Sequence, residues 1–289
     1  MLTFTKSTPQ SLVRQLKDLP AAPKILQKLQ KLLSSENVSL TMIADLLVME
    51  PGLSARIVQM ANSTHFNRGS NKVETVLEGI HRVGVKGVKE LVTYAVSSAL
   101  VGRPLAAYGL QAQTLWNRAV ACGLAAGYLA EHSGAVDYDD AYTSGLMHGL
   151  GLVVINSYAA KQAIPRRLPS SGYPQDFAPA ERDWLGFTHA TAGAALLQQW
   201  GISEPVKTAV EFQLAPEDAP EQHRRLCMTL ATARWARSLF CVTDEIIPDL
   251  PSPEWLEGAG LDRSQFDPWL KRTRARYEIA CTELRLGGY

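Results

Sequence analysis

Apolar residues recur with helical spacing along nearly the whole chain. In the segment 24–33 they fall on one face of an amphipathic helix: Ile25, Leu26, Leu29, Leu32 and Leu33. An alternation of apolar and polar residues, which would predict a half-buried strand, never continues beyond a few positions. The pattern therefore predicts an all-α, multi-helical fold without a sheet.

Capping residues and glycines place the ends of the predicted helices. Ser39, Asp137 and Thr188 are suitable N-caps, and Gly84 separates two helices at a tight corner. The predicted helices cover residues 24–33, 39–49, 53–61, 74–83, 86–100, 112–132, 137–158, 188–200, 204–213, 222–240 and 268–284. The stretch 165–179 contains four prolines and is predicted to be the longest loop.

The best internal boundary in the sequence is the tripeptide Gly102-Arg103-Pro104. Proline-rich turns follow the predicted helix 222–240 and indicate a second boundary, after which a last helix is predicted. The sequence thus predicts an N-terminal helical lobe over 1–103, a second helical lobe over 104–240 and a C-terminal helical extension over 241–289.

Composition and charge narrow the class of protein. With 46% hydrophobic residues, 20% charged residues and a net charge of +1, the chain is typical of a soluble globular protein, and no overall field would attract nucleic acid or an anionic membrane. The N-terminal segment lacks a signal pattern and no run approaches 18 apolar residues, so we expect a cytoplasmic protein. The four cysteines are widely spaced, which favours reduced, buried thiols: Cys122, Cys227, Cys241 and Cys281.

Several motifs in one order resemble the HDOD family. The segment 19–64 carries a Leu-Pro-x-x-Pro start, the turn Glu50-Pro51-Gly52-Leu53 and the tripeptide Ala61-Asn62-Ser63. The segments 73–92, LWNRAVACGLAAGYLAE, DYDDAYTSGLMHGLGLVVI and 186–212 continue the likeness. The resemblance implies an HDOD or HD-domain-like bundle in two packed lobes, with 104–240 as the HD-like lobe. It also implies a role in bacterial signal transduction.

The catalytic relatives of this family hold one or two divalent cations with an early His, a His-Asp pair and a late Asp. Such an ion turns a bound water into a nucleophile near neutral pH. At the matching positions this chain has Arg118 in LWNR, His148-Gly149 in GLMHGLG, and Thr232 or Ala233 in LATARWA. The resemblance therefore leaves one ligand, His148, and a permanent cation at Arg118 would oppose metal binding. We expect no cofactor, no metal and no enzymatic activity.

Two interpretations of His148 remain open. It is either a hydrogen-bonded histidine of the core, or part of a remnant pocket whose candidates are Arg118, His148, Gly149 and Thr232. In the second case a guanidinium would take a phosphate or carboxylate ligand bidentately.

Other conspicuous polar residues have structural explanations. For His189 the sequence favours capping or packing in the first turn of a helix, and for Asn62 it favours closing the end of one. The basic residues of the last helix favour a solvated surface over a nucleic-acid interface: Lys271, Arg272, Arg274 and Arg276.

These observations lead to a ranked functional hypothesis. The first is a non-catalytic signal-transduction module that binds signalling proteins such as a histidine kinase or a response regulator. The alternative is a receptor for an anionic small ligand such as a nucleotide. The third is a weak metal-dependent phosphohydrolase with substituted ligands. Membranes and nucleic acid are not expected partners.

Overall fold

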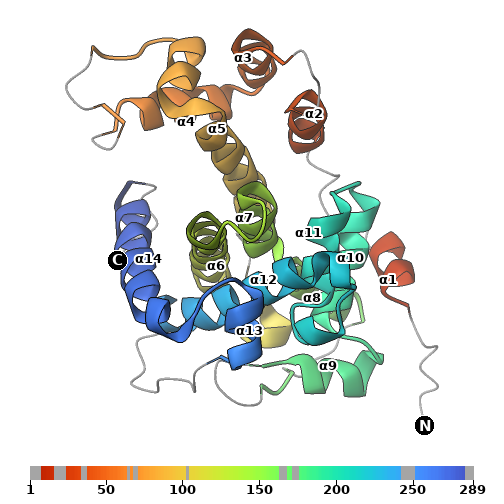
Figure 1. The fold of residues 1–289 in the computed structure, drawn as a ribbon. Coiled ribbons are helices and arrows are strands. Elements are labelled where there is room, and N and C mark those ends of the chain that lie inside the picture. Colours follow the sequence, from red (N-terminus) through yellow and green to blue (C-terminus); the bar gives the residue numbers. More distant parts are fainter. Residues whose placement is uncertain are drawn as a thin grey trace. The chain divides into compact units, whose positions relative to one another are not determined.

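The computed structural model describes residues 8–15, 24–33, 38–63, 66–67, 71–101, 104–162, 168–170, 176–241 and 251–283. These residues form α-helices and two short 3-10 helices (Figure 1). In these ranges the chain makes no strand, and its only bridge is an isolated one between Leu105 and Leu110. The predicted all-α fold is therefore confirmed. None of the described helices is both long enough and apolar enough to cross a bilayer.

The contacts within the chain divide it into two compact units. The smaller one comprises Ala21–Ser97 and Ile279–Tyr289, and the larger one Met1–Pro20 and Ser98–Glu278. The three-part division predicted at residues 103 and 240 is a different partition and stays a prediction. Gly102 and Arg103 themselves lie outside the described residues.

The smaller unit contains α2 (Lys24–Leu33), α3 (Leu40–Val48), α4 (Pro51–Ala61) and most of α5 (Val76–Val101). Ser39 caps α3 as predicted, since its Oγ accepts the Met42 N–H at 3.2 Å. Gly84 interrupts α5 with φ 79° and ψ 166°, which confirms the corner predicted there. Only glycine adopts such a conformation readily.

Asn62 ties the end of α4 to the segment that precedes α5. Its Nδ2 donates to the Val58 and Val73 carbonyls at 3.0 and 2.8 Å, and its Oδ1 accepts the Val73 N–H at 2.8 Å. One side chain thus satisfies three backbone groups, which agrees with the structural role predicted for it.

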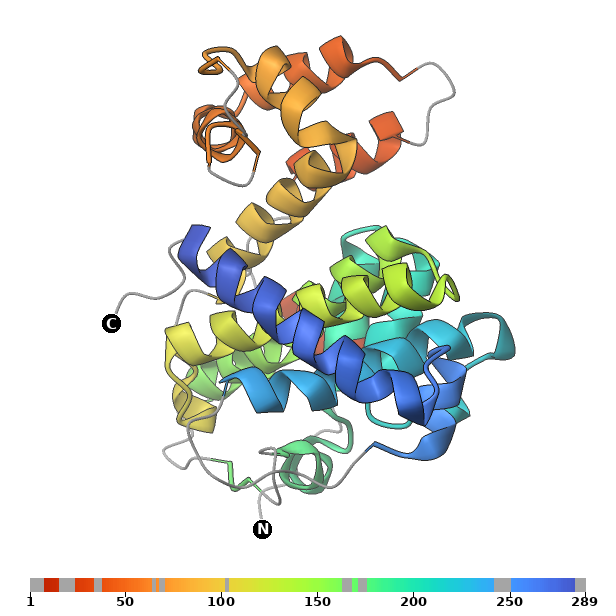
Figure 2. The same cartoon turned by 60° about the vertical axis from the view of Figure 1, so that its left-hand side comes forward.

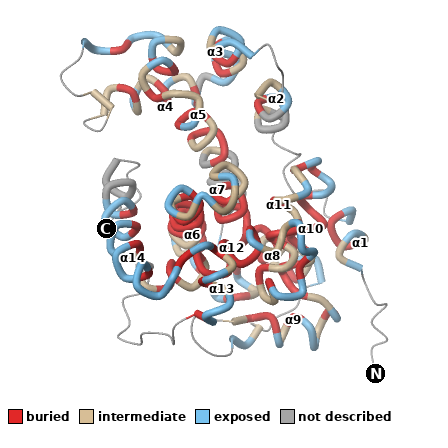
Figure 3. Tube along the Cα trace, viewed as in Figure 1, coloured by how far each residue is buried: buried red, intermediate tan, exposed pale blue. Residues whose placement is uncertain are grey.

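The larger unit is built around α6 (Ala112–Ser133). The other elements of this unit are α1 (Pro9–Gln15), η1 (Ala106–Tyr108), α7 (Tyr138–Met147), α8 (Leu150–Lys161), α9 (Ala178–Leu185), α10 (His189–Gln199), α11 (Glu204–Glu211), η2 (Pro216–Asp218), α12 (Glu221–Cys241), α13 (Pro253–Gly258) and α14 (Arg263–Glu283). α6 packs against α7 and α12 and is largely buried (Figure 3). α14 crosses it at an angle (Figure 2), and a 2.9 Å ion pair between Arg276 and Glu131 joins the two helices.

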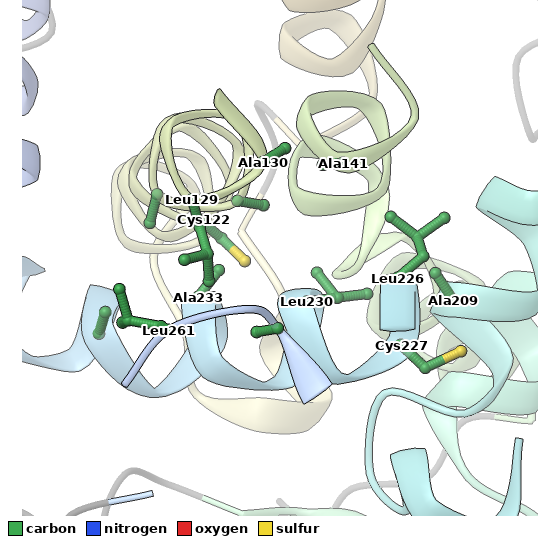
Figure 4. Close-up of a cluster of buried hydrophobic side chains, with 14 of the residues drawn as sticks. Cys122, Leu129, Ala130, Ala141, Ala209, Leu226, Cys227, Leu230, Ala233 and Leu261 are labelled. Atoms are coloured by element: carbon green, nitrogen blue, oxygen red, sulfur yellow. The ribbon is translucent and has the colours of Figure 1, made fainter. Parts of the chain in front are cut away.

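Small apolar residues let these helices approach closely. Cys122 and Leu129 of α6 face Leu230 and Ala233 of α12, and Ala130 of α6 lies beside Ala141 of α7 (Figure 4). Phe266 and Trp269 of α14 belong to the same buried cluster. Cys122 and Cys227 are buried in this cluster and form no disulfide among the described residues, as predicted. Burial raises the pKa of Cys227 to about 12, so it stays a neutral thiol. The side chains of Cys241 and Cys281 lie outside the described part.

The single helix predicted over 137–158 is wrong, because the chain turns at His148 and Gly149 between α7 and α8. In a continuous helix the His148 carbonyl would accept the Leu152 N–H. Here Leu152 donates to the Gly149 carbonyl at 3.1 Å, and Gln213 Nε2 donates to the His148 carbonyl at 3.0 Å. The end of α7 thus involves the side chain of Gln213, which is distant in sequence. The periodicity of apolar residues carries no information on such a contact.

Three helices were not predicted, namely α1, α9 and α13, and α14 begins before the predicted residue 268. The first three are short, with six to eight residues each, and therefore show little periodicity. α14 begins early because Asp262 caps it: its Oδ1 accepts the Gln265 N–H at 2.9 Å, and its own N–H donates to Gln265 Oε1. Pro268 then lies within the helix. Of the predicted loop 165–179, residues 165–167 and 171–175 lie outside the described ranges.

Gly151 provides the first test of this packing. A Cβ at this position would lie 1.7 Å from the His189 carbonyl oxygen and 2.8 Å from the Gly193 nitrogen, both backbone atoms of α10. We expect Gly151→Ala to lower the free energy of unfolding by about 1–3 kcal/mol or more, because α8 and α10 would have to separate. Denaturant unfolding followed by circular dichroism measures this.

Gly149→Ala is the matched control, since its Cβ would meet only the terminal Leu115 Cδ1 methyl at 3.1 Å. That side chain can move, so the cost should be clearly smaller. Equal stability losses for the two variants would contradict the close α8–α10 contact.

Candidate functional site

His148 lies buried at the end of α7. Its Nδ1 is 2.6 Å from the Gly145 carbonyl oxygen, and because a carbonyl only accepts, Nδ1 carries the proton. Burial, followed by the charges of Arg237 and Arg234, lowers the pKa of His148 well below its usual 6.5. The ring is therefore neutral at pH 7, with Nε2 as an acceptor.

The two arginines that act on His148 come from α12. Arg237 is 9% exposed, and Arg234 is half-buried with its Nε fully enclosed. Three residues apart, they lie on neighbouring turns of one face of the helix. Burial and the adjacent Arg237 lower the pKa of Arg234 to about 10, so that it remains charged at neutral pH.

Gln213, just after α11, connects Arg234 to His148. Arg234 Nη1 donates to the Gln213 backbone carbonyl at 2.6 Å. The Gln213 side-chain Nε2 donates to the carbonyls of His148 and Val210 at 3.0 and 2.9 Å. These two acceptors fix the orientation of the amide, which leaves Oε1 as a buried acceptor without a partner in the described structure.

The residues predicted to form the remnant pocket occupy different places. Gly149 directly follows His148 and lies against Leu115 of α6. Arg118 is one turn further along α6 and half-buried. Thr232 is buried on α12, and its Oγ1 donates to the Trp255 carbonyl of α13 at 3.5 Å. A shared site containing Arg118, His148, Gly149 and Thr232 stays a prediction.

A divalent cation does not fit the residues around His148. His148 could ligate only through Nε2, because Nδ1 donates to the Gly145 carbonyl. Position 149 offers no carboxylate, and two arginines supply positive charge. Within the described ranges, no three His, Cys, Asp or Glu side chains lie close enough together to hold a metal ion. The arrangement suits an anion better than a cation.

A second buried polar group lies at the start of α10. His189 donates from its backbone N–H and its ring Nδ1 to Glu181 Oε2 at 2.7 and 2.8 Å, and the Tyr108 hydroxyl donates to Glu181 Oε1 at 2.7 Å. Glu181 is fully buried; burial alone would raise its pKa, but His189 and these hydrogen bonds lower it overall. The group joins η1, α9 and α10, so the packing role predicted for His189 agrees with the structure.

The sequence of this chain matches the model of one known protein family. The model of the HDOD domain matches residues 19–216, more than half of the chain. The chain belongs to the HDOD family. The resemblance identified from its motifs is thereby confirmed.

A relative in Treponema pallidum (strain Nichols), described as an uncharacterized protein, is 30% identical over 234 residues. The alignment covers 80% of this HDOD chain but only 44% of that relative. The chain thus spans less than half the length of the curated relative.

Three solved structures share the HDOD fold. An HDOD domain protein of unknown function from Geobacter sulfurreducens is 21% identical with a TM-score of 0.73, and the match covers 97% of this chain and 99% of that one. A candidate signal transduction protein from Marinobacter aquaeolei VT8 is 23% identical with a TM-score of 0.72, over 93% and 60%. A candidate phosphohydrolase from Shewanella amazonensis SB2B is 24% identical with a TM-score of 0.65, over 94% and 97%. At these identities the likeness establishes the fold.

Arg234, Arg237 and Gln213 were not predicted from the sequence as members of the site. A signal for the arginines was present, since they interrupt the small and apolar residues of the segment LCMTLATARWARS. Gln213 carried no comparable signal, because its role depends on a contact across 65 residues. The basic residues of α14 behave differently: Arg276 pairs with Glu131 and lies over Tyr128, and Arg274 pairs with Glu278.

The buried, neutral His148 predicts a pH-dependent stability. Because its pKa is lower in the folded HDOD chain than in the unfolded one, its contribution is present above pH 6.5 and is lost as the pH falls towards the folded value. Wild type should lose roughly 1 kcal/mol of unfolding free energy between pH 7.5 and 5.5 from this residue. In His148→Asn, which can still donate to Gly145, that loss should disappear. Urea unfolding at the two pH values measures it, and an unchanged pH dependence in the variant would contradict a neutral His148.

Proposed function

We propose that this HDOD chain is a non-catalytic, cytoplasmic module of signal transduction that acts by binding a partner protein. The observation that carries the proposal is the charge around His148, where two arginines of α12 stand near a family position that binds cations in catalytic relatives. A hydrolytic metal would have to bind beside these charges with one imidazole nitrogen available. Without metal-dependent hydrolysis, we infer that the chain functions by binding another molecule.

A second observation supports a protein partner. The large apolar side chains that are exposed in the described structure all lie on or beside α3: Val38, Met42, Val48 and Met49, which are 38%, 44%, 59% and 67% exposed. Exposed methionines with neighbouring aliphatic side chains are common at protein-binding surfaces, because the flexible thioether adapts to its partner. We call these four residues the α3 surface. The Marinobacter aquaeolei protein is named for signal transduction, which fits a partner such as a histidine kinase or a response regulator.

A receptor for an anionic small ligand is the second candidate function. It is favoured by the positive charge of Arg234 and Arg237 and by the unused acceptor Gln213 Oε1. The two functions are compatible, since binding of the anion would be the signal and a change in partner binding would be the response. The third possibility, a weak phosphohydrolase, fits the name of the Shewanella amazonensis protein but not the charges around His148.

The absence of metal chemistry can be measured directly. After incubation with Mn²⁺, Mg²⁺ or Ni²⁺ and desalting, the purified chain should retain no stoichiometric metal, because arginines repel a cation where carboxylates would attract it. It should also fail to hydrolyse bis-p-nitrophenyl phosphate in the presence of these ions. Retained metal together with turnover would overturn the proposal.

Partner binding can be localised with variants of the α3 surface. Affinity capture with the intact chain should recover a signalling protein, whose binary affinity is then measured with purified components. The double variant Val48→Asp, Met49→Asp should weaken that affinity at least about tenfold, because charge would replace the apolar contact. Ala160→Asp, at an exposed position of α8, should leave it within about twofold. Equal effects of both changes would contradict binding through α3.

A further inference from the structure

Three of the buried polar atoms without partners in the described structure belong to neighbouring residues of the larger unit. They are Arg234 Nε, Arg237 Nε and Gln213 Oε1. Gln213 accepts from Arg234 through its backbone and donates to the His148 carbonyl through its side chain. These unused groups therefore belong to neighbouring residues in contact or in electrostatic range of one another, and do not arise from unrelated sites.

Buried guanidinium groups are costly unless they are paired. Removal of a cation from water is repaid by an anion or by several hydrogen bonds. Arginines of the larger unit that are more exposed have partners: Arg276 pairs with Glu131, Arg274 pairs with Glu278, and Arg224 donates to the Ala219 carbonyl. Arg237, by contrast, is more than nine-tenths buried and makes no hydrogen bond or ion pair within the described ranges.

Within the described ranges, no carboxylate forms an ion pair with either arginine. Arg234 and Arg237 repel each other, and the neighbouring His148 is neutral. The charge of Asp176 attracts Arg234. Two buried cations with one such acid among the described residues carry an excess of positive charge that an added anion would remove.

We propose that Arg234 and Arg237 bind the phosphoryl group of a small anionic ligand, with the Gln213 side-chain carbonyl accepting a hydrogen bond from a hydroxyl of that ligand. The inference rests on the receptor function proposed above and assigns it a ligand class and a site on α12. A phosphoryl group carries close to two negative charges at neutral pH and presents three acceptor oxygens. It therefore matches two planar guanidinium groups in both charge and donor geometry.

The hydrogen-bond acceptors beside the arginines indicate which groups the ligand carries in addition to its phosphoryl group. Gln213 Oε1 and the neutral His148 Nε2 both accept hydrogen bonds. A ligand that offers hydroxyl donors next to its phosphoryl group, such as a nucleoside monophosphate, satisfies both kinds of group. Inorganic phosphate shares the chemistry recognised by the arginines, so the two probes are tested separately.

The experiment uses the intact chain with inorganic phosphate and with AMP, each titrated by calorimetry against a chloride buffer of the same ionic strength. Arg237→Met and Arg234→Met should each weaken binding of the probe about 10–100-fold, as expected for a lost charge-assisted contact. Arg225→Met changes an exposed arginine of the same helix and should leave the affinity within about twofold.

Melting temperature provides a readout that separates binding from folding. Without a probe, Arg237→Met should melt at or above the wild-type temperature, because an uncompensated buried charge has been removed. With phosphate or AMP, only wild type and Arg225→Met should gain stability. Such a result would distinguish a ligand site from a structural arginine, whose loss would lower the melting temperature in every buffer.

The inference is overturned if neither probe binds wild type, or if both α12 variants bind as wild type does. A loss of binding in Arg118→Ala but in neither α12 variant would also overturn it. These outcomes leave the non-catalytic proposal intact, since that proposal fails only on metal-dependent turnover.

Discussion

The packing of the larger unit depends on one hydrogen bond, in which the Gln213 side-chain amide donates to the His148 carbonyl. That carbonyl therefore does not accept the Leu152 N–H, as it would in a continuous helix. This bond separates α7 from α8 and turns the chain where glycines bring backbones together. A Cβ at Gly145 would lie 2.6 Å from the Cys122 carbonyl oxygen, and one at Gly151 would meet the His189 carbonyl. α7 and α8 can therefore each touch a different helix, α6 in one case and α10 in the other, because the chain bends between them.

The same turn determines the electrostatics of the site. It directs the buried His148 ring to the Gly145 carbonyl and places it within range of Arg237 and Arg234. Burial, and then these two charges, lower the pKa of His148 and keep the ring neutral. Arg237 and Arg234 thus place positive charge beside a buried, neutral imidazole.

Sequence alone predicted most of the helical frame but only part of the site. Local signals sufficed for the cap at Ser39, the corner at Gly84 and the fold class, because they depend on neighbours in the chain. His148 was found through its motif. The break after it, and the membership of Gln213, arise from one contact between residues 65 positions apart, for which periodicity carries no signal. The arginines of α12 were visible as charges in an apolar segment, but their burial became evident only in the fold.

The course of the chain through the two units has a practical consequence for dissecting this protein. α1 belongs to the larger unit, where Leu12 and Val13 are buried and the helix packs on α8 and α10, although the smaller unit follows it in sequence. The larger unit is therefore discontinuous, because Ala21–Ser97 of the smaller unit lies between its two segments and Ile279–Tyr289 of the smaller unit follows the second one. A fragment cloned from residue 104 onwards would leave uncovered the apolar surface on α8 and α10 that Leu12 and Val13 protect. An excision of the smaller unit should instead rejoin the two flanking segments through a linker.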